Sequence, residues 1–180
     1  YNSQKLIDVF IKLTEIIVYE NDRAFILEAL INKVSSFKNT STVELFFSKV
    51  ITSIEKFNNT NLKDRLYYIY IYNFTKNPFL YNKFFDKLVN KRNDIKNESY
   101  RFMFYINLSK VFININQDNI AFSYLKSAID SIIETIDDNN PNNLKNNKLL
   151  ICIRYLYKNI SSFEKISFYH YFPMFIFGFE

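Results

Sequence analysis

Hydrophobic positions recur three and four residues apart along most of the chain. Between residues 5 and 19, one stripe with this spacing contains Leu6, Val9, Phe10, Leu13, Ile16 and Ile17. Such a stripe predicts an amphipathic helix whose apolar side faces a core. The same spacing predicts helices over residues 24–37, from 41 onward, and over 61–74, 78–91, 97–114, 118–137, 141–159 and 161–170. The pattern therefore predicts about nine helices joined by short polar turns.

Two of the predicted helix starts carry recognisable capping signals. Ser41 and Glu44 have the spacing of a capping box, in which each side chain accepts from a free backbone N–H. Asn77 and Pro78 combine an N-cap residue with proline at the first helical position. Because the connections are short, successive helices are expected to run antiparallel.

The chain contains a single glycine, Gly178. Tight hairpin turns need residues with positive φ, and phosphate-binding loops need several glycines. Helices tolerate the shortage best, because asparagine can take the left-handed position that ends a helix. The sequence therefore predicts an all-α fold, and it excludes P-loops and dinucleotide-binding fingerprints.

Ala121 and Ala128 stand seven residues apart in a segment where other core positions are large. The surrounding pattern reads Tyr105, Leu108, Ser109, Phe112, Ala121, Leu125 and Ala128. This segment, at about residues 102–135, resembles a tetratricopeptide repeat, a helix–turn–helix unit of about 34 residues. It departs from that pattern in Ser109 for glycine, Tyr105 for tryptophan and Ile133 for proline. The resemblance implies that two helices cross closely where Ala121 meets Ser109.

The resemblance also implies an architecture and a binding surface. The helices would stack as helix–turn–helix pairs in an α-solenoid over residues 1–170. An irregular helical bundle is the alternative. The concave side would bind a partner through Met103, Ile106, Lys110 and Ile113. An apolar groove with one lysine suits an amphipathic helix or an extended apolar peptide. Independently of the resemblance, Pro173 and Gly178 interrupt the last residues, which predicts an aromatic non-helical tail over 171–180.

Composition is that of a globular protein, with 48% hydrophobic and 23% charged residues in 180. The net charge is +5, and much of the excess gathers in one basic group. Its members are Lys83, Lys87, Lys91, Arg92, Lys96 and Arg101. Such a patch can hold a nucleic-acid backbone, or it can simply keep a helical protein soluble. Asp86, Asp94 and Glu98 interrupt the group, which favours the second interpretation.

Side chains for catalysis or metal binding are scarce. His170 is the only histidine and Cys152 the only cysteine, so a histidine-based metal cluster and an intramolecular disulfide are both excluded. Cys152 lies in an apolar helical pattern and is predicted to be a buried thiol. We find no catalytic constellation, and we expect neither enzymatic activity nor a cofactor.

The expected function is therefore a non-enzymatic scaffold that binds a protein or peptide partner. The alternative is a basic helical-repeat module that binds RNA or single-stranded DNA. No apolar run approaches the ~20 residues of a transmembrane helix. The chain begins at Tyr1, which suggests a fragment or processed form, so the missing signal-peptide pattern says little about the compartment. The localisation is left open, with the cytoplasm only weakly favoured.

Overall fold

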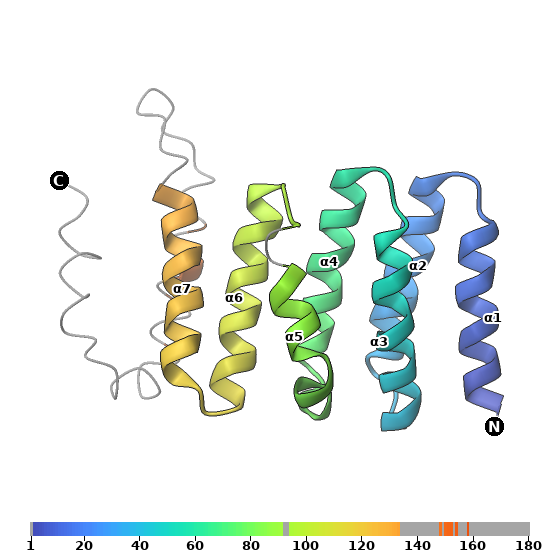
Figure 1. Ribbon diagram of the computed structural model, residues 1–180, viewed down its shortest axis with the longest axis horizontal. Helices are drawn as coiled ribbons and strands as arrows, with labels where there is room; N and C mark the ends of the chain where they lie inside the picture. The colour runs from blue at the N-terminus through green and yellow to red at the C-terminus, as the bar shows by residue number, and fades with distance from the viewer. Residues whose placement is uncertain are drawn as a thin grey trace. The chain divides into compact units, whose positions relative to one another are not determined.

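The computed structural model describes residues 2–91, 94–133, 148, 150–152, 154 and 158 (Figure 1). The chain divides into two compact units, Tyr1–Asn107 and Leu108–Glu180. The division falls within a helix, and each unit is described by itself. The prediction of one domain over residues 1–170 stays a prediction.

The described residues form helices and turns and contain no strand. The helices are α1 (Asn2–Ile16), α2 (Glu20–Val34), α3 (Thr40–Glu55), α4 (Thr60–Phe74), the short 3-10 helix η1 (Pro78–Leu80), α5 (Tyr81–Lys91), α6 (Glu98–Asn114) and α7 (Asp118–Ile133). The all-α prediction is confirmed for this part of the chain. The predicted helices over 141–159 and 161–170 and the tail over 171–180 lie outside the described residues, except that residues 148, 150–152, 154 and 158 are helical.

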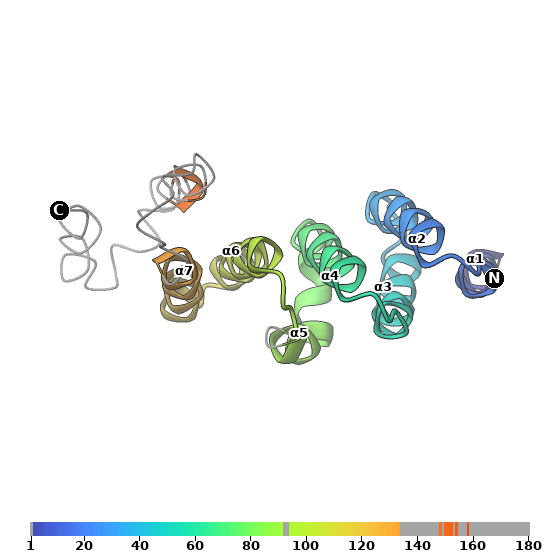
Figure 2. The same ribbon diagram turned by 90° about the horizontal axis from the view of Figure 1, so that it is seen from above.

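Helices of the first unit lie in two rows. α1 packs beside α3, α2 packs beside α4, and each of these helices also contacts its neighbour in the chain. Figure 2 shows α1, α3 and α5 in one row and α2 and α4 in the other. Among the described helices, α3 is the one that packs beside α1 in this row.

Helix pairs recur at a regular interval in the first unit. α2, α4 and α6 begin at residues 20, 60 and 98, and α1 and α3 begin at residues 2 and 40. The interval of 38 to 40 residues is longer than the about 34 residues of a tetratricopeptide repeat.

Aromatic side chains fill much of the core of this unit. The rings of Phe47 and Tyr70 meet edge to face with centroids 5.0 Å apart, a favourable geometry for an aromatic pair. The Tyr70 hydroxyl donates a hydrogen bond to the backbone carbonyl of Phe47 at 3.1 Å. Burial raises the pKa of Tyr70 well above its ordinary value, so this hydroxyl remains a donor that bridges α3 and α4.

Asparagine side chains cap α3 and α4, and for α3 the sequence had suggested serine instead. Asn39 accepts a hydrogen bond from the backbone N–H of Thr42 at 2.9 Å, and α3 begins at Thr40. The predicted capping box of Ser41 and Glu44 is therefore wrong, because Ser41 already lies inside the first turn. Asn59 caps α4 in the same way, accepting from the backbone N–H of Leu62 at 3.2 Å.

Asparagine also ends α6. Asn116 has φ of 57°, the left-handed conformation that asparagine tolerates better than most residues. The backbone N–H of Gln117 then reaches back to the carbonyl of Phe112 at 2.9 Å. An asparagine thus takes a role that glycine usually fills, as the glycine-poor composition predicted.

In the second unit, Ser109, Ala121 and Ala128 are all fully buried. The rings of Phe112 and Tyr124 stack with centroids 5.2 Å apart. The small residues of the segment therefore lie in a packed interior. The tetratricopeptide identity of the segment stays a prediction.

Candidate interaction surface

The apolar stripe of α1 does not face the core. Five of its members are solvent-exposed, with exposed fractions between 39% for Phe10 and 73% for Ile16. We call this surface the α1 outer face, and it comprises Leu6, Val9, Phe10, Leu13 and Ile16. The prediction that this stripe packs inward is wrong.

The residues of α1 that face the core are Ile7, Ile11 and Thr14, which are all buried. α1 is therefore apolar on two sides, and periodicity alone could not say which side would be covered. The contacts of α1 with α3 decide which side of α1 is covered. These contacts use the side of α1 that carries its two acids.

Two ion pairs join α1 to α3. Asp8 pairs with Lys49, and Glu15 pairs with Lys56 at 2.6 Å. All four side chains are partly exposed, so each pair contributes at most about 1 kcal/mol. The two acids are seven residues apart in the sequence, and so are the two lysines. Because the spacings match, both pairs can form together, and they set the register of the two helices.

The same charge direction recurs along the first unit. In each ion pair between helices among the described residues of this unit, the acid belongs to the earlier helix, and the base lies on or directly after the next helix of the same row. The further pairs are Glu28 of α2 with Arg65 of α4, Glu44 of α3 with Lys83 of α5, and Glu55 of α3 with Lys91 of α5. On α3, the side that meets α1 thus carries lysines, whereas the α1 outer face carries large apolar residues.

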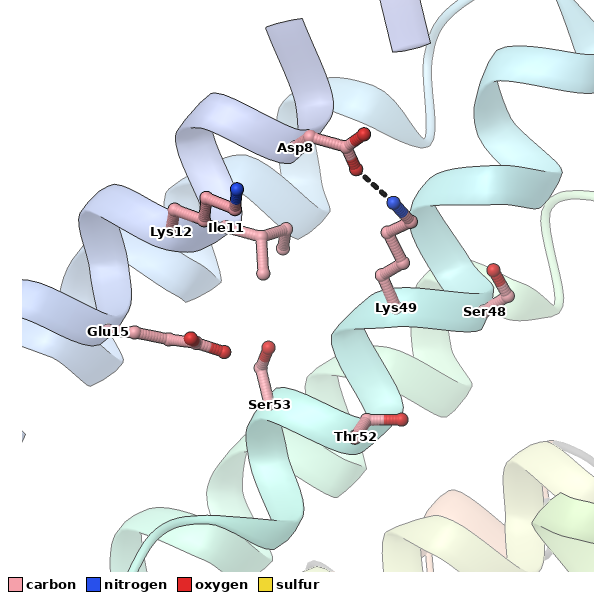
Figure 3. A pocket seen from close by; sticks show the side chains of 8 residues that line it. All are labelled: Asp8, Ile11, Lys12, Glu15, Ser48, Lys49, Thr52 and Ser53. Carbon is pink, nitrogen blue, oxygen red and sulfur yellow. Dashed lines mark hydrogen bonds and ion pairs between the residues drawn. The ribbon is translucent and has the colours of Figure 1, made fainter. Parts of the chain in front are cut away.

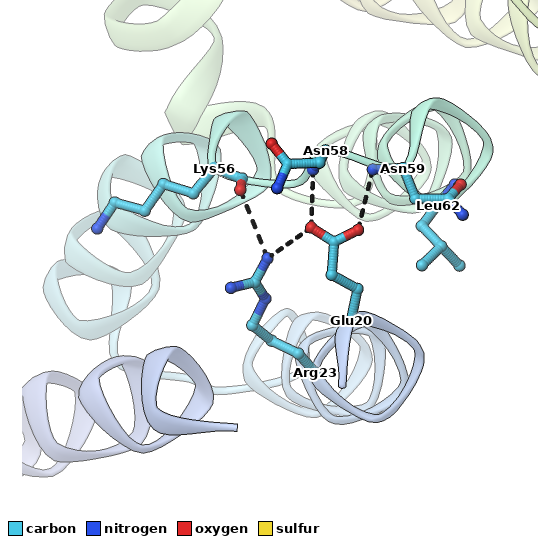
Figure 4. Close-up of polar contacts among 6 residues, drawn as sticks. All are labelled: Glu20, Arg23, Lys56, Asn58, Asn59 and Leu62. Carbon is cyan, nitrogen blue, oxygen red and sulfur yellow. Dashed lines mark hydrogen bonds and ion pairs between the residues drawn. The ribbon is translucent and has the colours of Figure 1, made fainter. Parts of the chain in front are cut away.

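A carboxylate also anchors the connection before α4 (Figure 4). The backbone N–H groups of Asn58 and Asn59 donate to Glu20, the first residue of α2, at 2.7 and 2.9 Å. These two hydrogen bonds lower the pKa of Glu20 below its ordinary value. Arg23 completes the corner, because its guanidinium lies 3.2 Å from Glu20 and 4.2 Å from the centroid of the Phe57 ring.

A shallow groove of about 310 Å³ lies between α1 and α3 (Figure 3). Its lining residues are Asp8, Ile11, Lys12, Glu15, Ser48, Lys49, Thr52 and Ser53. Three of its four charged residues are engaged in the ion pairs that join the two helices. The groove is open, and these pairs largely compensate its charges.

The predicted groove residues are less accessible than expected. Ile106 is buried, with 1% of its surface exposed, and Met103, Lys110 and Ile113 are half-buried. Burial lowers the pKa of Lys110, and the positive charge of Lys158 lowers it further. Met103 and Ile106 belong to the first unit and Lys110 and Ile113 to the second, so a shared groove stays a prediction. Ile106 itself does not lie on an open surface.

The predicted basic group is partly neutralised. Lys83 pairs with Glu44 at 2.7 Å, and Lys91 pairs with Glu55 at 2.6 Å and with Asp94 at 3.3 Å. The hydrogen bond with Glu55 raises the pKa of Lys91 above its ordinary value. The other members are spread out: Lys96 is exposed, Arg101 is half-buried, and the Lys87 side chain and Arg92 lie outside the described residues.

In the described part of the chain, no three His, Cys, Asp or Glu side chains are grouped as a metal site would need. Cys152 is buried, as predicted, and burial raises the pKa of its thiol to about 12. His170 lies outside the described residues.

Among the described helices, none combines the length and the apolar character needed to cross a membrane.

The sequence had identified the residues of the α1 outer face but had assigned them to the core. A sequence signal for two apolar sides was present, because Ile7 and Ile11 lie opposite the stripe.

No protein family, curated protein or solved structure matches this chain.

Proposed function

We propose that this chain is a non-enzymatic helical-repeat scaffold, and that it binds an α-helix of a partner protein on the α1 outer face. Three features support a repeat architecture. Helix pairs recur every 38 to 40 residues. Within each row, neighbouring helices pack side by side, α1 on α3 and α2 on α4. The described ion pairs between helices each join an acid of the earlier helix to a base of the later one.

The observation that carries the proposal is the exposed apolar surface of α1. Five large apolar side chains on one helix face are between 39% and 73% exposed. Contiguous apolar surface of this kind on a protein usually marks an interaction site. Burying the exposed half of a Leu or Ile side chain contributes about 1 kcal/mol, so the five together can drive association after its entropic cost is met.

This surface replaces the groove as the favoured contact. The groove interpretation needed Ile106 to touch the partner, but Ile106 is buried. The α1 outer face requires no rearrangement of the helices, since its side chains are already accessible.

Site-specific photo-crosslinking tests the proposal. A photoreactive phenylalanine analogue is placed at Leu13, on the face, and in a second protein at Lys38, which is exposed and outside it. In native extract, we expect discrete crosslinked protein bands from position 13 and none from position 38.

A matched pair of substitutions then asks whether the face is responsible. With a capture tag on the chain, Leu13→Asp should abolish recovery of the crosslinked proteins. Phe25→Asp should not, although Phe25 is 71% exposed on α2. If position 13 produces no discrete band, or if the two substitutions act alike, the proposed contact is wrong.

The alternative function, binding of RNA or single-stranded DNA, loses support from the geometry. Two of the lysines in the predicted basic group are held by acids of α3. Tyr72 is exposed enough to stack on a base, but the ammonium of Lys76 already lies 4.1 Å from the centroid of its ring. Tight binding of a single strand at low salt that falls steeply as salt is added would revive this alternative.

A further inference from the structure

We infer that the helix bound on the α1 outer face carries acidic residues along one flank of its apolar stripe. This inference rests on the proposed function, because it names the chemistry of the partner for the same surface.

The spacing of the face favours a helical occupant. Leu6, Val9, Leu13 and Ile16 follow one another at alternating intervals of three and four residues. This is the heptad pattern by which two helices pack side by side at a shallow angle. An extended peptide would not match that spacing, because its side chains alternate every two residues.

The two flanks of the stripe differ in charge. In the heptad register set by Leu6, Lys5 and Lys12 occupy the position before each Leu, and both are exposed. Phe10 occupies the position on the other flank, and α1 ends at Ile16 before the next such position. Acidic residues on the partner would complement the basic flank, and apolar residues would complement the opposite flank.

The two acids of α1, Asp8 and Glu15, are engaged with lysines at α3 and do not pair with Lys12. Lys12 makes no ion pair with any described residue. A carboxylate from a bound helix can therefore reach Lys12 without displacing an existing partner.

A second copy of the chain does not fit the face. Antiparallel pairing of two α1 helices would place the lysine flanks against each other. Parallel pairing would place the lysines of one copy beside Phe10 of the other. Neither arrangement provides an opposite charge, and flanking charges are what select partners in paired helices.

Two synthetic peptides of about three heptads test the inference, with identical Leu and Ile stripes. One carries Glu along the flank that faces Lys12, and the other carries Lys there. Fluorescence anisotropy with the whole chain should show about fivefold tighter binding of the Glu peptide at low salt, and 0.5 M salt should reduce this preference.

Substitution of the flank identifies its contribution. Lys12→Gln should weaken the Glu peptide about threefold and leave the Lys peptide unchanged. Lys38→Gln, which removes an exposed lysine away from the face, should change neither affinity. Leu13→Asp should abolish binding of both peptides, and Phe25→Asp should not.

The outcomes separate the inference from the proposed function. Equal affinities for the two peptides, both lost with Leu13→Asp, would overturn the acidic flank and leave helix binding in place. Absence of binding by either peptide together with no crosslinking at position 13 would overturn both. A dimer in sedimentation that Leu13→Asp dissociates would show a second copy as the occupant and overturn the inference.

Discussion

The buried carboxylate of Asp64 accepts a hydrogen bond from the backbone N–H of Asn97 at 2.6 Å. The same oxygen accepts from the N–H of Lys96 at 2.9 Å, so α4 holds the two residues that precede α6. Glu20 holds Asn58 and Asn59 before α4 in a similar way. In both places a carboxylate of one helix holds the residues that directly precede a later helix.

Removal of the Asp64 carboxylate should destabilise the first unit. Asp64→Ala leaves two backbone N–H groups without their acceptor, and we expect a loss of about 1–3 kcal/mol in the free energy of unfolding. Asp64→Asn should cost less, because its amide oxygen can still accept. Urea denaturation of the three proteins measures the difference, and an Ala variant as stable as wild type would show that the anchor contributes nothing.

The Glu20 anchor should depend on pH. Its pKa is lowered in the folded chain from the ordinary value of 4.5. Its stabilisation is therefore present above pH 4.5 and is lost as the pH falls through the folded-state pKa. We expect Glu20→Gln to cost about 1 kcal/mol at pH 7 and nothing at a pH low enough to protonate Glu20.

Thermal melts of Glu20→Gln and wild type across this pH range check the prediction. Asp130→Asn serves as the control, because Asp130 is exposed on α7 and has no charged partner among the described residues. A difference between Glu20→Gln and wild type that persists unchanged at low pH would contradict the anchor.

Adjacent residues of α1 should respond oppositely to truncation. Ile7 is 4% exposed and Leu6 is 53% exposed. Ile7→Ala should cost about 2–4 kcal/mol, because it leaves a cavity in the core. Leu6→Ala should stay within about 0.5 kcal/mol of wild type. Chemical denaturation of both variants tests which side of α1 faces the core. If Leu6→Ala were the more destabilising change, the apolar stripe would face the core instead.

Ala121 should not tolerate a larger side chain. It is fully buried, and Ala121→Leu should cost about 1–3 kcal/mol through overpacking despite the good helix propensity of leucine. Ser123→Leu, at an exposed position of the same helix, should be close to neutral. An unchanged or raised melting midpoint for Ala121→Leu would count against close packing around this residue.

The thiol of Cys152 should be unreactive in the native chain. It is buried, and its pKa is raised to about 12, so at pH 8 the nucleophilic thiolate is a negligible fraction. Labelling by a thiol-specific reagent should be slow in buffer and rapid in denaturant. Rapid native labelling would mean that the segment around Cys152 opens readily.

The sequence by itself determined the helical class and most helix positions of the described part. Gly178 is the only glycine, and apolar residues recur at helical spacing, so local preferences and patterning agreed. The helical turn at Pro78 and the end of α6 at Asn114 followed from residue types whose backbone effects are local. The predicted cap at Asn77 is wrong, because its side chain makes no capping hydrogen bond, and α5 begins only at Tyr81 after the 3-10 helix η1. The burial of Ala121, Ala128 and Cys152 also followed from local pattern, because each sits within a strongly periodic apolar segment.

Only the tertiary structure decided which side of each helix is covered. α1 is apolar on two sides, and the contacts of Asp8 and Glu15 with α3 turned Ile7 inward and Leu6 outward. The neutralisation of Lys83 and Lys91 was likewise invisible in the sequence, because their acidic partners lie one helix pair earlier. Periodicity is a property of one helix, whereas burial and charge pairing depend on which helices become neighbours.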